Sequence, residues 1–143
     1  NLSSPLRIEK KLYIVRNTDK GEVLDELNSE NKITLGDKIR TKLVLKAERE
    51  MEFLHLKDMR AGGLEPAEAM SGYRWTGGLG YYQTTRDASM NFFIDHIQKG
   101  TYIIEYDVYA NARGKFSNGI STFQSMYAPE FNSHTEGIEV TIK

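Results

Sequence analysis

The alternation of apolar and polar residues is clearest in residues 90–109, where it predicts two strands joined by a short turn at 98–100. In the second strand every other residue from Tyr102 to Val108 is apolar, and the residues between them are polar apart from Ile103. A period of two is typical of a half-buried antiparallel strand, because successive side chains point to opposite faces of a sheet. The first strand is apolar on both faces, as expected for a central position. The segment therefore predicts the paired-strand core of an all-β domain.

Further strands are predicted on both sides of this segment. The alternation over 6–15 is interrupted only by Lys10, and the cleanest alternation in the chain covers 39–47. Turn residues separate these runs, and no stretch has a convincing helical period. Eight or nine short antiparallel strands are therefore expected, folded as a β-sandwich like that of fibronectin domains. The other segments expected to form strands are 22–27, 51–58, 81–87, 116–127 and 137–143.

Residues 61–80 differ in character, because six glycines and a proline rule out a long regular element. This segment and the residues after it carry four large aromatics, Tyr73, Trp75, Tyr81 and Tyr82. Such rings can form a stacking platform for sugars or a hot spot for a protein partner. They can equally close one end of a sandwich. Both interpretations stay open.

A second aromatic segment, 126–131, contains Tyr127 and Phe131 on either side of Pro129. It can be an exposed recognition loop. The alternative is a strand that ends at the proline and is anchored by its two rings. Tyr127 and Phe131 therefore join the four earlier aromatics as candidate interface residues.

Composition excludes several classes of function. The net charge is -1 with both signs scattered along the chain, so no electrostatic footprint for nucleic acid is present. The absence of cysteine excludes a disulfide framework, a thiol nucleophile, a cysteine zinc site and a cysteine thioester. No apolar run approaches the ~20 residues that span a bilayer. The abrupt first residues, without a signal-peptide pattern, suggest a piece of a longer protein.

No motif for catalysis or for a cofactor is recognisable. His55, His96 and His134 lie on different predicted elements without metal-ligand spacing, so we expect ordinary sheet histidines. The charged runs at 57–60 and 86–87 can form buried ion pairs at strand ends, which are more often structural than catalytic. We therefore expect no enzyme activity, no cofactor and no metal.

Several segments, in this order, resemble the C-terminal part of bacterial alpha-2-macroglobulin-like proteins. They include GLEP at 63–66 and MYAPE at 126–130. The versions at 57–60, 71–75 and 82–89 are similar to those of Bacteroides-type bacteria. The match covers 36–140, and its remaining segments are 47–53, 56–58, 92–95, 99–102, 105–106 and 119–125.

The resemblance implies a single C-terminal macroglobulin-like domain over 1–143, with 1–35 as an N-terminal strand hairpin and 36–143 as the best-matching core. It implies a parent that traps proteases in the cell envelope or periplasm, held by a lipid anchor elsewhere in the parent chain. The expected partners are other domains of that chain and, indirectly, a trapped protease. Nucleic acid and direct membrane insertion are not expected.

The leading hypothesis is thus a non-enzymatic interaction domain that docks on its neighbours in the parent. A carbohydrate-binding β-sandwich is the alternative, with Tyr73, Trp75 and Tyr82 as its stacking platform.

Overall fold

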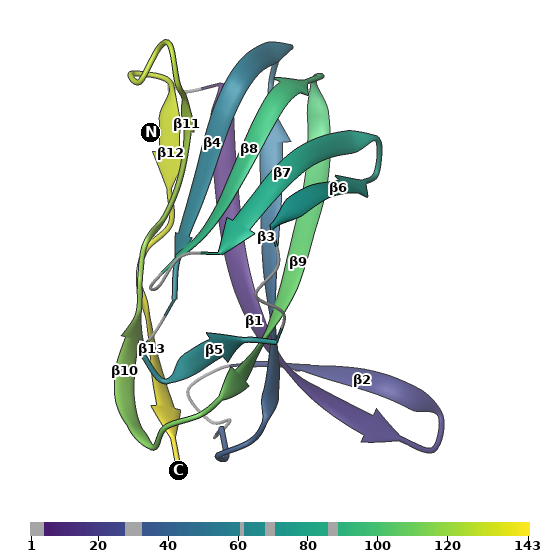
Figure 1. Cartoon of the computed structure of the whole chain (residues 1–143), viewed down its shortest axis with the longest axis vertical. Coiled ribbons are helices and arrows are strands. Elements are labelled where there is room, and N and C mark those ends of the chain that lie inside the picture. The colour runs from purple at the N-terminus through teal and green to yellow at the C-terminus, as the bar shows by residue number, and fades with distance from the viewer. Residues whose placement is uncertain (1–4, 28–32, 61, 68–70, 86–88) are drawn as a thin grey trace.

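The computed structural model describes residues 5–27, 33–60, 62–67, 71–85 and 89–143, and in these residues it contains thirteen strands and no helix. Two sheets face each other, and a two-stranded ribbon continues one end of the molecule (Figure 1). All pairings between the strands are antiparallel. The predicted all-β antiparallel sandwich is confirmed. No helix in the described residues is long and apolar enough to cross a membrane.

The first sheet has five strands and the second has six. In spatial order the first contains β2 (Gly21–Glu26), β1 (Leu6–Thr18), β3 (Lys38–Ala47), β9 (Gly100–Ala110) and β5 (Leu64–Pro66). The second contains β12 (Asn132–His134), β11 (Ser121–Ser125), β4 (Met51–Met59), β8 (Ser89–Ile97), β7 (Leu79–Thr85) and β6 (Gly72–Thr76). The ribbon pairs β10 (Gly114–Asn118) with β13 (Ile138–Ile142).

The core lies between the two sheets and is filled by the alternate residues of their inner faces. Leu43 of β3 and Ile104 of β9 are paired across the first sheet, and both are fully buried. Leu56 of β4 and Phe92 of β8 hold the equivalent position in the second sheet. The buried side chains of both sheets form one cluster.

The expected pairing of the two strands in 90–109 is wrong. β8 pairs with β4 and β7, whereas β9 pairs with β3 and β5, so the turn at 98–100 crosses from one sheet to the other. The connection from β3 to β4 crosses in the same way. Because of these two connections, β3 lies beside β9 in the first sheet and β4 lies beside β8 in the second. The prediction that β8 is central is confirmed.

The strand number is higher than eight or nine, because several strands of three to five residues carry too few positions to show a period. Residues 61–80 contain β5 and β6 and lead into β7, so they are not one long loop. Residues 116–127 contain part of β10 and the whole of β11, which belong to different sheets. A break at Gly119 separates these two strands, where a Cβ would lie 2.2 Å from Cβ of Met59.

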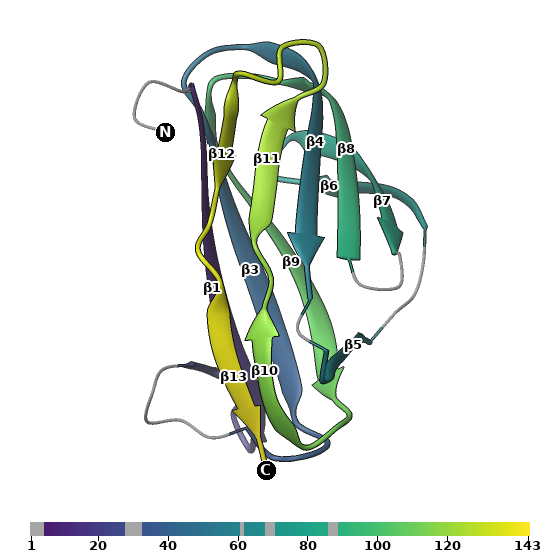
Figure 2. The same ribbon diagram turned by 90° about the vertical axis from the view of Figure 1, so that its left-hand side faces the viewer.

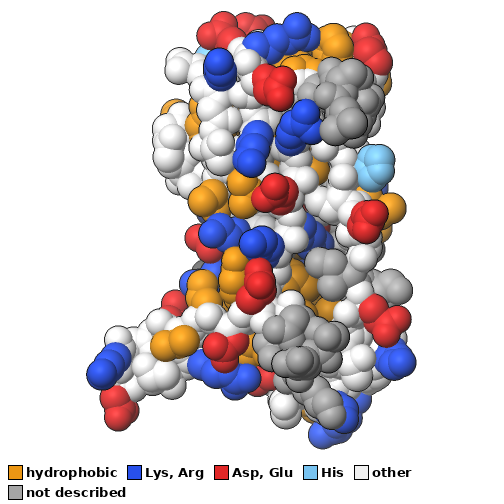
Figure 3. All heavy atoms as spheres, turned by 180° about the vertical axis from the view of Figure 1, so that it is seen from behind, with side chains coloured by type: hydrophobic (Ala, Val, Ile, Leu, Met, Phe, Trp, Pro, Cys, Tyr) orange, Lys and Arg blue, Asp and Glu red, His pale blue; other side chains and the backbone are white. Residues whose placement is uncertain are grey.

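Both ends of the sandwich are well defined in the side view (Figure 2). β1 and β4 begin at one end, where β11 also ends and turns into β12. The ribbon of β10 and β13 lies at the opposite end, with the C-terminus. The hairpin of β1 and β2 projects sideways from that second end (Figure 1). Positive and negative side chains are interspersed on the face of the molecule seen in Figure 3.

Candidate functional site

The most exposed aromatic surface lies on the outer face of the second sheet. We call it the aromatic shelf: Tyr73 and Trp75 of β6, Tyr82 of β7 and Phe93 of β8. Tyr73 pairs with Tyr82, and Tyr82 pairs with Phe93, so the register of three neighbouring strands lines up three of the rings. The rings of Tyr73 and Tyr82 meet edge to face, with centroids 5.0 Å apart. Three of the predicted interface residues are therefore brought together.

The shelf depends on a tight turn of two glycines, which joins the two strands that carry Tyr73, Trp75 and Tyr82. Gly77 and Gly78 both have positive φ, 54° and 87°, as a two-residue type I′ hairpin turn requires. This turn joins β6 to β7 and places Trp75 directly opposite Gly80. A Cβ at position 80 would lie only 2.9 Å from Cη2 of Trp75, so the missing side chain leaves room for the indole against the backbone.

The shelf is open to a partner. Tyr73 is 75 % exposed and Trp75 is 77 % exposed, which is unusual for rings of this size. They border a hollow of about 480 Å³, and Asp95 and His96 of β8 form its polar rim. His96 is 3.3 Å from a carboxylate oxygen of Glu50.

Tyr81, the fourth predicted residue in this region, lies on the opposite face of β7 from Tyr82. It is buried, and its ring meets Phe92 of the core with centroids 5.8 Å apart. Burial raises the pKa of Tyr81, although the charge of Arg74 opposes the shift. Tyr81 thus has little surface to offer a partner, and it supports the shelf from below.

Tyr127 and Phe131 lie elsewhere, at the end of the sandwich where β1 and β4 begin. Tyr127 meets Phe53 edge to face at 5.2 Å, and the guanidinium of Arg49 lies 4.8 Å from the ring centroid of Phe131. With Met126 these aromatics form a second group at the surface, which we call the tip cluster: Phe53, Met126 and Tyr127, which are exposed, and Phe131, which is half-buried. Met126 lies in the segment 126–131 that the sequence marked as a candidate recognition loop, whereas Phe53 was not marked.

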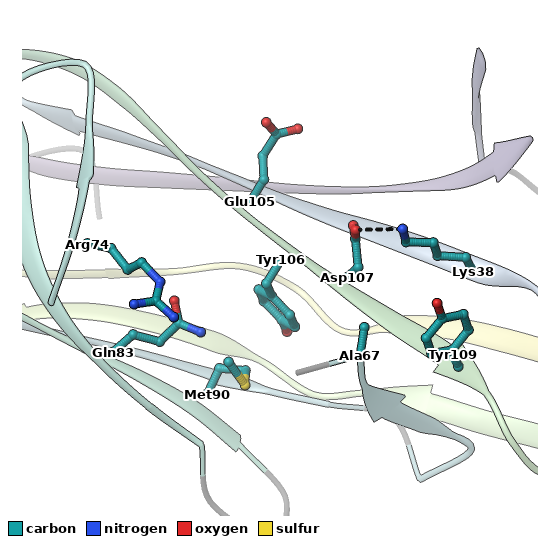
Figure 4. Close-up of a pocket in the computed structure, with 9 residues that line it drawn as sticks. All are labelled: Lys38, Ala67, Arg74, Gln83, Met90, Glu105, Tyr106, Asp107 and Tyr109. Atoms are coloured by element: carbon teal, nitrogen blue, oxygen red, sulfur yellow. Dashed lines mark ion pairs between the residues drawn. The ribbon is translucent and has the colours of Figure 1, made fainter. Parts of the chain in front are cut away.

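A polar hollow of about 360 Å³ opens between the two sheets (Figure 4). Arg74 and Gln83 lie together on one side of it, and Asp107 pairs with Lys38 on the other at 3.4 Å. Burial alone would raise the pKa of Asp107, but hydrogen bonding and charge from Arg40, with Lys38, hold it below its usual value. The carboxylate of Asp107 is neutralised by Arg40 and Lys38, as in a structural ion pair. This hollow therefore offers no evident chemistry.

A second polar group is enclosed between the sheets around Asp58. Lys10 of β1 and Ser121 of β11 each lie 2.5 Å from Oδ1 of Asp58, and Tyr106 of β9 donates to its Oδ2. The group explains why Lys10 broke the alternation of its strand: its side chain points inward and is buried with that of Asp58. Asp58 forms the buried pair expected in 57–60, with a partner 48 residues away. Because this cluster is enclosed and its hydroxyls donate to the carboxylate, it is structural.

The three histidines do not converge. His55 hydrogen-bonds Oδ1 of Asn91 at 2.9 Å and stacks on Phe93 at 4.8 Å, while His134 is exposed on β12. In the part of the chain that the structure describes, no three His, Cys, Asp or Glu side chains are grouped to hold a metal. The charged run at 86–87 lies outside the described residues.

Comparison with known proteins identifies the family. The profile described as "Bacterial Alpha-2-macroglobulin MG10 domain" matches residues 6–130, most of the chain. The chain belongs to this family. Membership confirms the resemblance to bacterial alpha-2-macroglobulins, and because the family is non-catalytic it also confirms that the chain is not an enzyme.

Solved structures agree with an MG10 fold. A mutant of Salmonella alpha-2-macroglobulin superposes with a TM-score of 0.73 at 17% identity, over 99% of this chain and 9% of that chain. The trypsin-activated protein from Escherichia coli gives 0.68 at 16% identity, over 97% and 10%. A curated relative, "Circularly permutated Ras protein 2" of Dictyostelium discoideum, is 27% identical over 111 residues, which are 78% of this chain and 3% of that protein.

The chain thus spans 9% of the Salmonella protein, 10% of the Escherichia coli protein and 3% of the Dictyostelium protein.

Proposed function

We propose that this MG10 domain is a C-terminal interaction module of a protease-trapping alpha-2-macroglobulin, and that its aromatic shelf docks on a neighbouring domain of the parent chain. The observation that carries the proposal is the exposure of Tyr73 and Trp75 on one sheet face. Tyr and Trp are the side chains most enriched at binding hot spots. Two rings held side by side by a tight hairpin also lose little conformational freedom on binding.

A domain of the same chain is the favoured partner because it is always present at high effective concentration. An intramolecular interface can therefore be small and still persist. Such contacts would help to hold the parent in its uncleaved state, so that a trapped protease is an indirect partner.

The test uses the full-length parent with Tyr73→Ala and Trp75→Ala together. Loss of the contact should make the uncleaved parent more susceptible to limited proteolysis between domains, with little change in the fold of this one. A matched control is Tyr109→Ala, which removes a half-exposed tyrosine from the outer face of the other sheet. Equal susceptibility in the double variant and the control would exclude docking through the shelf.

We further propose that the parent resides in the cell envelope or periplasm through a lipid anchor elsewhere in its chain, and that it is of the Bacteroides type. Support comes from the segments at 57–60, 71–75 and 82–89. Fractionation of cells that express the parent would test the location, and recovery in the cytosol would contradict it.

A carbohydrate-binding function is the second candidate, favoured by the arrangement of the rim. Asp95 and His96 stand beside the rings, where they could bind sugar hydroxyls while an apolar sugar face stacks on Trp75. Titration with a set of glycans should then shift the fluorescence of Trp75, the single tryptophan. No response to any glycan, at concentrations up to the millimolar range, would remove this candidate.

A further inference from the structure

Phe53 has an unusual backbone conformation for a bulky residue. Its φ is +56°, and it is the only non-glycine residue with a positive φ among the residues that the structure describes. A side chain of this size rarely adopts the left-handed region, and it persists there only when the surrounding structure imposes it. The amide of Met126 donates to the carbonyl of Phe53 at 2.8 Å, just beyond the last pair of β4 and β11, and so helps to fix this conformation.

The domain gains little of its own from this strained residue. Phe53 is 41 % exposed, and its ring packs on that of Tyr127, which is 79 % exposed. Met126, beside them in the chain, is half exposed as well. An aromatic residue held in a costly conformation on the surface, against other exposed apolar side chains, indicates that the surface has a use outside the domain.

The position of the tip cluster indicates what covers it. The amide of Glu48 donates to the carbonyl of Pro5 at 2.9 Å, and Pro5 lines the same hollow as Arg49 and Phe131. The chain thus enters the sandwich beside the cluster. In Figure 2 the start of β1 lies at the same end as the start of β4 and the turn from β11 to β12.

We propose that the tip cluster is the seat of the part of the parent chain that immediately precedes this domain. This occupant is favoured over a more distant domain because its own end must lie close to Pro5, which lines a hollow together with Phe131 of the tip cluster. A short tether makes a modest apolar contact persistent. The proposal shares with the proposed function only the existence of a longer parent, and it uses none of the shelf residues.

Hydroxyl-radical footprinting can test this in the full-length parent, compared with the 143-residue chain. Met126 should be oxidised several-fold more slowly in the parent, and Tyr127 should be protected in parallel. Met90 is buried and gives the baseline for a covered methionine. Trp75 reports on the shelf in the same experiment, so a failure of the proposed function would appear at Trp75 and a failure of this proposal at Met126.

A shortened fragment of the parent and a substitution at Phe53 identify the segment that covers the tip cluster. A fragment that keeps only the preceding segment and this domain should retain the protection of Met126, and Phe53→Gly should reduce it several-fold. Equal oxidation of Met126 in the parent and the 143-residue chain would overturn the proposal. Protection that survives removal of the preceding segment would overturn it as well, by assigning the seat to a different occupant.

Phe53→Gly also has an informative control in Phe53→Ala, since alanine removes the ring but keeps the backbone strain. In the 143-residue chain the glycine variant should melt about 4 °C higher than the alanine variant. In the parent both should expose Met126. If neither variant changes the footprint, Phe53 is not part of the seat and the proposal fails.

Discussion

Asp58 connects the two sheets through an ion pair and hydrogen bonds. It accepts from Lys10 and Tyr106 of the first sheet and from Ser121 of the second. Burial lowers the pKa of Lys10, although the charge and hydrogen bond of Asp58 oppose this. A buried ion pair is weak evidence for net stability, but removing one partner leaves an uncompensated charge or acceptor. The cluster therefore makes stability sensitive to each of its members.

Tyr106→Phe tests this sensitivity. At neutral pH the variant should lose about 1–3 kcal/mol of unfolding free energy, because one oxygen of buried Asp58 loses its donor. Burial, reinforced by Asp58, raises the pKa of Tyr106 well above its usual 10.0. The folded protein then keeps a proton that the unfolded chain releases above pH 10, so the stability from this group falls as pH rises past 10. The variant should show a shallower fall, measured by denaturant unfolding at a series of pH values.

Tyr109→Phe is the matched control, since Tyr109 lies on the same strand but is half exposed. It should leave the free energy of unfolding at neutral pH unchanged. If Tyr106→Phe and wild type lose stability in parallel above pH 10, the buried phenol is not the source of the slope.

The close contact between Gly80 and Trp75 leads to a prediction about the aromatic shelf. Gly80→Ala should displace the indole of Trp75, because the new Cβ would meet its ring atoms at 2.9–3.2 Å. The free energy of unfolding should change by less than about 1 kcal/mol, since the indole is exposed and can move. Near-ultraviolet circular dichroism of the single tryptophan measures the displacement. The same substitution in a Trp75→Ala background should have no effect beyond its own small cost, and a full effect there would refute the assigned contact.

At this scale the sequence predicted which faces are buried but not which residues meet. Alternation placed Ile104 and Val108 inward correctly and marked Lys10 as an exception. The reason for the exception, Asp58, is 48 residues away and leaves no local signal. The same limit applies to Tyr81 and Tyr82, since adjacent tyrosines can be told apart only when the phase of their strand is known.

At the scale of elements, the hairpin of β6 and β7 depends on its turn. Gly78→Val should destabilise the hairpin by about 1–2 kcal/mol, because a β-branched residue is strained at a φ of 87°. Gly77→Asn is the control, since asparagine tolerates the left-handed region and is common in such turns. Hydrogen exchange of the backbone amides in 72–85 should be faster in the first variant and near wild type in the second. Equal exchange in both would contradict the turn assignment.

Short strands and strand pairing could not be predicted from the sequence. The long strands were predicted because eight or more residues display a period, whereas β5 and β12 have three residues each. A short turn such as 98–100 does not reveal whether it joins partners in one sheet or crosses to another. That choice is made by pairing with distant strands, here β3 with β9 and β4 with β8. The shelf could be proposed from its aromatics, but its separation from the tip cluster could not.

For the whole molecule, the two crossings make the sheets depend on each other. β3 continues into β4 and β8 continues into β9, each time from one sheet to the other, so neither sheet is a separate segment of the chain. The core side chains likewise come from both sheets and form one cluster. Two sheets that share both chain connections and a core are expected to unfold together.

Single core truncations can test this cooperativity from either side. Leu45→Ala in β3 and Leu56→Ala in β4 each remove a fully buried side chain, and each should cost about 2–5 kcal/mol. Ile103→Ala, on the outer face of β9, is the control and should cost less than about 1 kcal/mol. Hydrogen exchange of the slowest amides should accelerate by the same factor in both sheets for either core variant. Acceleration confined to the mutated sheet would show that the sheets open independently, and that the Asp58 cluster and the crossings do not couple them.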